Sequence, residues 1–352
     1  MEVTVVGAYG YTGQLICQEF DSLRISFNVA GRNLQNLEDV KNKFSMISKS
    51  FRLDMTVEED IDTLFSESDI IVNCAGPYTE ESALLLEKVA QSGKYYVDIS
   101  GELGFVKNSF DKYHGLAKKR GSLIVHGCAF ESLIADLLFQ ITPSFESVKT
   151  FYWFNQKYVS PGTKMTMKLS QYRKPLCVIN HKWKIFDDNN RYHIGMGDKK
   201  LTAVPYPLPE VAFAINRHSC KNAHSFLLLD QEEAKYLNRT WSDSGNPMKK
   251  LKKLKERRIK GPSAEQRAQH RSRIIVEFIL SDGREIVKII ENIDMYGTTA
   301  KAIVLAVQSV LKKRHTLKGV ICPAKMFEGR ESEVLEELSV SPLVIPFNRK
   351  SC

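Results

Sequence analysis

The chain begins with a short apolar run that leads directly into three evenly spaced glycines. Val3 to Val6 is typical of a buried strand, and Gly7, Gly10 and Gly13 then open a segment with apolar residues at helical spacing. The first N–H groups of such a helix have no partner within it, and the helix dipole favours negative charge there. This order predicts a site for a phosphate-containing ligand, with contacts from Gly7, Tyr9, Gly10, Tyr11, Thr12 and Gly13.

Five further apolar runs follow in the first 130 or so residues, and helical patterns separate them. The predicted strands are 25–30, 51–53, 69–75, 95–99 and 123–126. Strands that alternate with helices predict an α/β domain with a doubly wound parallel sheet, the Rossmann fold. Ligands of such sheets bind outside the carboxyl ends of the strands. We therefore expect the polar residues that end these strands to meet at one edge.

The residue that ends the second strand predicts which dinucleotide binds. A site for NAD carries an acidic residue about 20 positions after the glycines, which binds the ribose hydroxyl. Here the strand ends in Arg32, and the next acids, Glu38 and Asp39, lie in the following helix. A guanidinium pairs well with a 2′-phosphate, so we predict NADP(H) in preference to NAD(H). The alternative is that Arg32 is a surface arginine on a loop.

The remaining predicted cofactor contacts are Asn33, Asp54, Cys74, Ala75, Gly76, Pro77, Tyr78, Ser100 and Gly101.

Four motifs in this order resemble the saccharopine dehydrogenase-like oxidoreductases, especially the branch that contains the trans-acting enoyl reductases. They are residues 7–13 (GAYGYTG), 30–33 (AGRN), 73–78 (NCAGPY) and 96–102 (YVDISGE). Residues 128–132 (CAFES) look like the C-G-F-D-S element of that branch, with Ala for Gly and Glu for Asp. Residues 261–263 with Arg267, 296–300 and a degraded segment at 319–324 also match it. The resemblance implies a Rossmann domain, an α+β domain, last helices that return to the first domain, and hydride transfer from a nicotinamide.

Three side chains at the strand ends are the predicted catalytic candidates. Tyr78 follows the fourth strand, Glu102 the fifth and Cys128 the sixth. Each can carry or move a proton, and each has a structural alternative as a packing, anchoring or core residue. Asp98 can orient the cofactor or cap backbone N–H groups in its turn. His126, His181 and His193 lack the spacing of metal ligands, so we expect no metal site.

The C-terminal half predicts a mainly antiparallel sheet. Strands are expected at 149–154, 164–171, 182–187 and 273–280, and 285–291 should form a hairpin with the last of these. Residues 298–312 form an amphipathic helical pattern. We expect a Rossmann domain at 1–147, an α+β substrate or oligomerisation domain at 148–293, and a return of about 294–352 to the first domain.

The net charge of +9 comes from one local segment. Between Met248 and Arg273 there are eleven Lys or Arg residues and two acids, a balance that equals the net charge of the whole chain. Residues 249–260 are a solvated helix face in one interpretation and a contact for anionic surfaces or an acidic carrier in the other. No aromatic residues interleave with these charges, so nucleic acid is not an expected partner.

The composition favours a cytoplasmic protein. No apolar run is long enough for a membrane span, the first strand leaves no room for a signal peptide, and the seven cysteines include no C-x-x-C pair. We predict an NADP(H)-dependent oxidoreductase that reduces an activated C=C or C=N bond of a small-molecule, lipid or carrier-bound substrate, and acts as a homodimer. The alternative is a non-enzymatic NADP-binding regulator or adaptor that uses residues 249–260.

Overall fold

A computed structural model describes residues 1–79, 81–155, 158–170, 175–186, 192–196, 199–235, 261–292, 294–312, 317–340 and 342–346. The chain forms two compact units, Met1–Leu133 with Tyr296–Val334, and Ile134–Met295 with Leu335–Cys352. The basic segment 249–260 lies outside the described residues, so its two interpretations stay open. Within the described part of the chain, no helix is long and apolar enough to cross a membrane.

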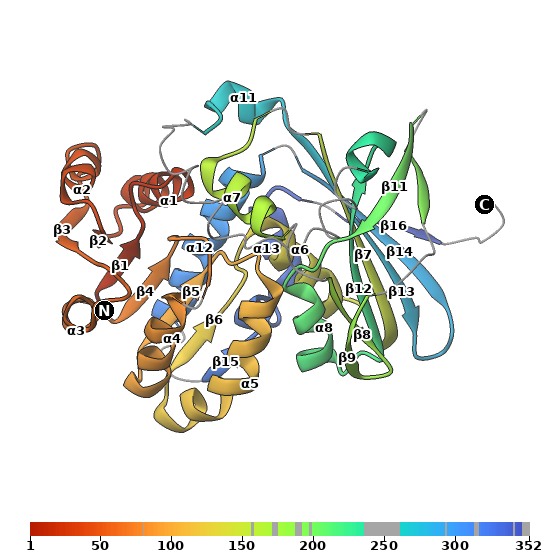
Figure 1. The fold of residues 1–352 in the computed structure, drawn as a ribbon, viewed down its shortest axis with the longest axis horizontal. Coiled ribbons are helices and arrows are strands. Elements are labelled where there is room, and N and C mark those ends of the chain that lie inside the picture. The colour runs from red at the N-terminus through yellow and green to blue at the C-terminus, as the bar shows by residue number, and fades with distance from the viewer. Residues whose placement is uncertain are drawn as a thin grey trace. The chain divides into compact units, whose positions relative to one another are not determined.

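The first unit contains a parallel sheet of seven strands among the described residues, in the order β15-β6-β5-β4-β1-β2-β3 (Figure 1). Its strands are β1 (Val3–Val6), β2 (Phe27–Gly31), β3 (Ile47–Arg52), β4 (Ile70–Asn73), β5 (Tyr95–Asp98), β6 (Leu123–Val125) and β15 (Gly319–Ile321). The predicted doubly wound sheet is therefore confirmed. Val5, Val29, Val72 and Val97 are fully buried, as expected for parallel strands covered on both faces.

Helices cover both faces of this sheet. They are α1 (Tyr11–Ser22), α2 (Leu34–Lys41), α3 (Glu58–Ser66), α4 (Glu81–Ser92), α5 (Leu103–Arg120), α12 (Met295–Lys312), the 3₁₀ helix η1 (Pro323–Phe327) and α13 (Glu331–Glu337). α4 and α5 pack against each other on one face, and α1 and α12 lie on the other (Figure 1). β15 was not predicted as a strand. It joins the edge beside β6 because Gly319 donates its N–H to the Ser122 carbonyl oxygen at 2.7 Å.

The second unit has a mixed, mostly antiparallel sheet, as predicted. Nine described strands form it: β7 (Phe145–Asn155), β8 (Leu176–Ile179), β9 (Lys182–Ile185), β10 (His193–Met196), β11 (Lys199–Pro205), β12 (Asn222–Leu229), β13 (Arg271–Leu280), β14 (Glu285–Asn292) and β16 (Leu343–Pro346). Its helices are α6 (Phe130–Gln140), which starts in the first unit, α7 (Pro161–Ser170), α8 (Glu210–His218) and α11 (Ala264–Ala268). The predicted hairpin is the β13–β14 pair.

The structure differs from two expectations for this half. Residues 164–171 were predicted as a strand, but α7 covers Pro161–Ser170. The reason is a local helix start: Ser160 Oγ accepts the Thr163 N–H at 3.1 Å, and a proline occupies the first helical position. The return of residues 294–352 to the first unit is also incomplete. β16 pairs antiparallel with β14, so the chain leaves the first unit after Val334.

Candidate functional site

The glycine turn after β1 is built so closely that side chains would not fit. A Cβ atom on Gly13 would lie 2.4 Å from the Gly7 carbonyl oxygen, and one on Gly7 would lie 3.0 Å from the Ala75 nitrogen. Gly7 also has φ +78°, which favours glycine. Gly10 precedes α1 as its N-cap and has no side chain that could cover the helix end. This compact turn at a helix N-terminus has the form of a phosphate cradle.

Tyr9, Tyr11 and Thr12 complete the predicted contacts of this turn. The Tyr9 ring packs on the backbone of Gly31, where an added Cβ would lie 2.6 Å from Cε1. The Tyr11 ring meets Tyr296 of α12 edge to face, with ring centroids 5.0 Å apart. Thr12 lies in the first turn of α1. α1, β2 and the start of α12 therefore meet around the glycine turn.

The ends of β2 and β3 carry Arg32, Asn33 and Asp54. Arg32 is exposed at the end of β2. Asn33 caps α2, because its Oδ1 accepts the Asn36 N–H at 3.0 Å. The pKa of Asp54 lies below its usual value, first because its carboxylate accepts hydrogen bonds from Thr56 and also because Arg32 and Arg52 are near. The predicted arginine thus stands beside an ionised carboxylate at this edge.

The loop after β4 packs against the glycine turn. Cys74 donates its N–H to the Val6 carbonyl oxygen at 2.9 Å, and Ala75 donates to Asn73 Oδ1 at 3.0 Å. Gly76 and Pro77 continue the loop to Tyr78, whose hydroxyl donates to the Asn73 carbonyl oxygen at 2.7 Å. Asn73 in turn donates from Nδ2 to the Tyr96 hydroxyl at 3.0 Å. Residues 73–78 are therefore held in one conformation by their own polar groups.

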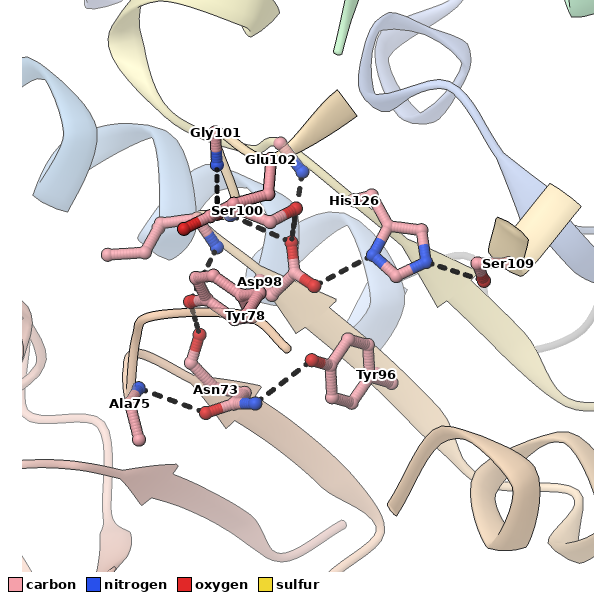
Figure 2. A network of polar contacts seen from close by, with 12 residues as sticks. Asn73, Ala75, Tyr78, Tyr96, Asp98, Ser100, Gly101, Glu102, Ser109 and His126 are labelled. Carbon is pink, nitrogen blue, oxygen red and sulfur yellow. Dashed lines mark hydrogen bonds and ion pairs between the residues drawn. The ribbon is translucent and has the colours of Figure 1, made fainter. Parts of the chain in front are cut away.

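A buried carboxylate joins the loops after β5 and β6 (Figure 2). Asp98 is fully buried. Its Oδ1 accepts from the Ser100 N–H at 3.0 Å, the Ser100 hydroxyl at 2.7 Å and the Gly127 N–H at 3.0 Å. Its Oδ2 lies 2.7 Å from His126 Nδ1, and His126 Nε2 lies 2.7 Å from the Ser109 hydroxyl of α5. Ser100 and Gly101, predicted as cofactor contacts, lie on the first of these loops.

The hydrogen bonds around Asp98 favour its ionised form. Burial by itself would raise the pKa of this carboxyl. The positive charge available on His126 and the hydrogen bonds from His126 and Ser100 outweigh burial and hold the pKa below its usual value. Asp98 is thus a fixed negative charge that ties two loops together.

His126 is a neighbour of Asp98 that the strand pattern alone did not predict. The sequence pattern led us to consider His126 only as a possible metal ligand. The parallel register pairs Val97 with Val125, so the residues that follow them, Asp98 and His126, stand next to each other. The sequence shows Asp98 and His126 at the ends of two strands. Their pairing can be predicted only once β5 and β6 are known to be neighbours in the sheet.

The three predicted catalytic residues are all buried. Tyr78 is 3% exposed, and burial followed by the charge of Asp98 raises its pKa well above the usual value. Cys128 is fully buried beside the Ala302 carbonyl oxygen, and burial raises its pKa too. Glu102 is 5% exposed and accepts the Gly101 N–H at 3.0 Å. This environment favours the structural alternative for Tyr78 and Cys128, and their catalytic roles stay predictions.

Replacing Asp98 should destabilise the first unit. In Asp98→Asn an amide nitrogen faces groups that donate, so we expect a loss of about 2–4 kcal/mol in the free energy of unfolding, measured by urea denaturation near neutral pH. Because the folded pKa of Asp98 lies below 3.8, its contribution is present above that value and is lost as the pH falls through the folded pKa. Asp111→Asn, on the exposed side of α5, is the matched control and should change stability by less than about 0.5 kcal/mol. Equal effects of the two substitutions would contradict this interpretation.

Replacing Gly13 should disrupt the cradle. The added methyl group of Gly13→Ala would collide with the Gly7 carbonyl oxygen, so α1 must shift away from the turn. We expect a loss of dinucleotide affinity of at least about tenfold, measured by fluorescence titration. In Gly115→Ala, within α5, the added Cβ meets nothing within 4 Å, so affinity should not change and stability should rise by up to about 1 kcal/mol. Unchanged affinity in Gly13→Ala would argue against a ligand at this turn.

Comparison with known proteins places these features in a family context. Residues 3–125 match the model of the saccharopine dehydrogenase NADP binding domain. The trans-acting enoyl reductase of Mycobacterium ulcerans is 33% identical over 143 residues, which cover 39% of this chain and 34% of that protein. The lipid droplet localized protein of Caenorhabditis elegans is 29% identical over 149 residues, with the same coverage. The matched stretch is thus about a third of the length of either relative.

A solved structure extends the likeness of the fold to the whole chain. Apo saccharopine dehydrogenase (L-Glu forming) from Saccharomyces cerevisiae has a TM-score of 0.66 at 10% identity, over 98% of this chain and 99% of that one. The resemblance inferred from the motifs is confirmed: residues 3–125 match the saccharopine dehydrogenase NADP binding domain, and the chain has a fold similar to that of saccharopine dehydrogenase.

Proposed function

We propose that this protein is an NADPH-dependent oxidoreductase that reduces an activated double bond. The observation that carries the proposal is the glycine cradle at the start of α1, in which a Cβ on Gly13 would lie 2.4 Å from the Gly7 carbonyl oxygen. Such a cradle suits a pyrophosphate, which needs backbone N–H groups at close range. Gly7, Gly10 and Gly13 with the first turn of α1 would hold the cofactor, which supplies a hydride to the acceptor when bound.

The preference for NADP(H) over NAD(H) is part of this proposal. Its support is the exposed Arg32 at the end of β2, the position where an NAD site carries an acid. Arg32 would pair with the 2′-phosphate. Asp54, which lies close to it, is already engaged with Thr56 through two hydrogen bonds of 3.0 and 2.7 Å. Because these hydrogen bonds already occupy the Asp54 carboxylate, it competes less with a phosphate for the Arg32 guanidinium.

An enoyl-type C=C bond is the acceptor we favour, with an imine C=N bond as the second candidate. The trans-acting enoyl reductase of Mycobacterium ulcerans, at 33% identity, supports the first. The fold of saccharopine dehydrogenase by itself does not separate the two. A non-enzymatic NADP-binding regulator is the competing function, because the three residues predicted as catalytic, Tyr78, Glu102 and Cys128, are all buried.

The cytoplasm is the location we propose. The relative from Caenorhabditis elegans, named for its location on lipid droplets, supports a lipid surface as the second candidate. We also propose that the protein acts as a homodimer.

Cofactor preference can be measured by thermal unfolding. NADPH should raise the melting temperature of the parent protein more than NADH at the same concentration, because only NADPH pairs with Arg32. Arg32→Ala should lower the affinity for NADPH by about tenfold or more and leave that for NADH within about threefold. Arg120→Ala, at the C-terminal end of α5, is the control and should behave like the parent. If neither nucleotide shifts the transition, the cofactor assignment fails. An unchanged preference in Arg32→Ala would refute only the role of Arg32.

The acceptor can be tested by the loss of NADPH absorbance. We expect oxidation with a 2-enoyl thioester and slower or no oxidation with a preformed imine, each compared with a saturated thioester as the blank. Faster oxidation with the imine would reverse the order of the two acceptors. Tight NADPH binding without oxidation by any member of either class would favour the regulator.

A further inference from the structure

Two stretches of the first unit contain no acidic residue. They are residues 112–130 and 296–327. The first contains the second half of α5 and all of β6, and the second contains β15 and all but the first residue of α12. Five cations of these stretches lie at the ends of α5 and α12 and directly before β15. We call them the basic patch: Lys118, Lys119, Arg120, Lys312 and Lys318.

The fold brings the end of α5 and the start of β15 together. The last turn of α5 is basic over residues 118–120, and Gly121 ends the helix in the left-handed conformation. Gly319 donates its N–H to the Ser122 carbonyl oxygen at 2.7 Å, so β15 begins beside the residues that follow α5 (Figure 1). A Cβ atom added to Gly121 would lie 4.0 Å from the Lys318 ammonium nitrogen. Cations distant in sequence therefore share one surface.

The side chains of the basic patch carry no bound carboxylate. All five residues are exposed, and none forms an ion pair with another residue in the described part of the chain. The acids that flank the two stretches are engaged elsewhere, Asp111 with Lys107 and Glu328 with Lys325. Cations in a last helical turn stabilise the helix dipole. That role does not explain Lys318, which lies outside any helix.

The form of the patch fits an extended anionic surface better than a protein partner. Protein interfaces depend on aromatic and apolar anchors at their centre, and lysine is depleted there. Among the described residues of the two stretches, no large apolar side chain is exposed. Flexible cations spread over two helix ends and a strand start can instead reach several lipid head groups at once.

The basic patch lies at the opposite end of the sheet from the glycine turn. β15, β6, β5, β4 and β1 are parallel, so all of them begin at the same end. β15 starts at the basic patch, whereas the glycine turn directly follows β1. A surface that binds the patch therefore leaves the carboxyl ends of the strands uncovered.

We propose that the basic patch docks this protein on a bilayer that carries anionic head groups. Lysine and arginine side chains near such a bilayer are attracted by its negative surface potential, and the attraction falls off within a Debye length. The contact is electrostatic and peripheral. It does not depend on the activity proposed above, and it differs from a contact through residues 249–260.

The test is co-sedimentation of the full chain with vesicles. The protein should bind vesicles of phosphatidylcholine with about 30% phosphatidylserine, should not bind phosphatidylcholine alone, and should be released at about 0.5 M salt. Removing four charges from the patch should lower the partition coefficient at least about tenfold. That variant combines Lys118→Gln, Lys119→Gln, Arg120→Gln and Lys318→Gln.

A matched control removes the same charge from exposed positions of the second unit. It combines Lys182→Gln, Lys184→Gln, Lys200→Gln and Lys221→Gln. Its partition coefficient should stay within about twofold of the parent, because the patch is intact. Both variants change exposed side chains only, so their thermal transitions should match that of the parent and show that they fold.

Three results would overturn the proposal. The first is a parent protein that does not bind the anionic vesicles, or binds phosphatidylcholine equally well. The second is an equal loss of binding in the control, which would indicate attraction by net charge alone. The third is full binding by the patch variant together with a loss on replacing lysines of the segment 249–260 with glutamine. The lysines to replace are Lys249, Lys250, Lys252 and Lys253.

Discussion

The ionised carboxylate of Asp98 holds together the edge on which the proposed chemistry depends. A buried charge is costly unless it is paired and hydrogen bonded. Asp98 meets both conditions, with acceptor contacts to Ser100 and Gly127 and a close contact to His126 at 2.7 Å. Because these partners come from the loops after β5 and β6, one side chain determines how both loops leave the sheet. The same residue also holds Cys128, whose N–H donates to the Asp98 carbonyl oxygen at 2.8 Å.

The glycine turn, at the other half of the edge, depends on the absence of side chains rather than on a charged group. A Cβ at Gly13 would lie 2.4 Å from the Gly7 carbonyl oxygen, so only glycine permits the close packing of α1 on the turn. The helix dipole then supplies positive potential at the turn. The site thus combines a backbone cradle for phosphate on one side with a rigid polar network on the other.

The sequence predicted the parallel sheet well because its signals are local. Each apolar run ends in a polar or glycine residue, and all six predicted strands are present. The prediction failed where the decisive information was a contact between distant residues. β15 is a strand because it pairs with β6, and β16 belongs to the second unit because it pairs with β14. Residues 164–171 are an exception, since Ser160 and Pro161 were a local helix signal that the alternating pattern obscured.

The sequence by itself determined the glycine cradle, the arginine at the end of β2 and the order of the strand-end motifs, because backbone freedom, charge and periodicity are properties of neighbouring residues. Only the tertiary structure decided which of the strand-end side chains are available. Tyr78 and Cys128 have suitable chemistry, but packing buries them and raises their pKa values. Asp98 and His126 became partners only when β5 and β6 came side by side. Reactivity at this edge depends on burial and on hydrogen-bond partners, and both arise from residues far apart in the chain.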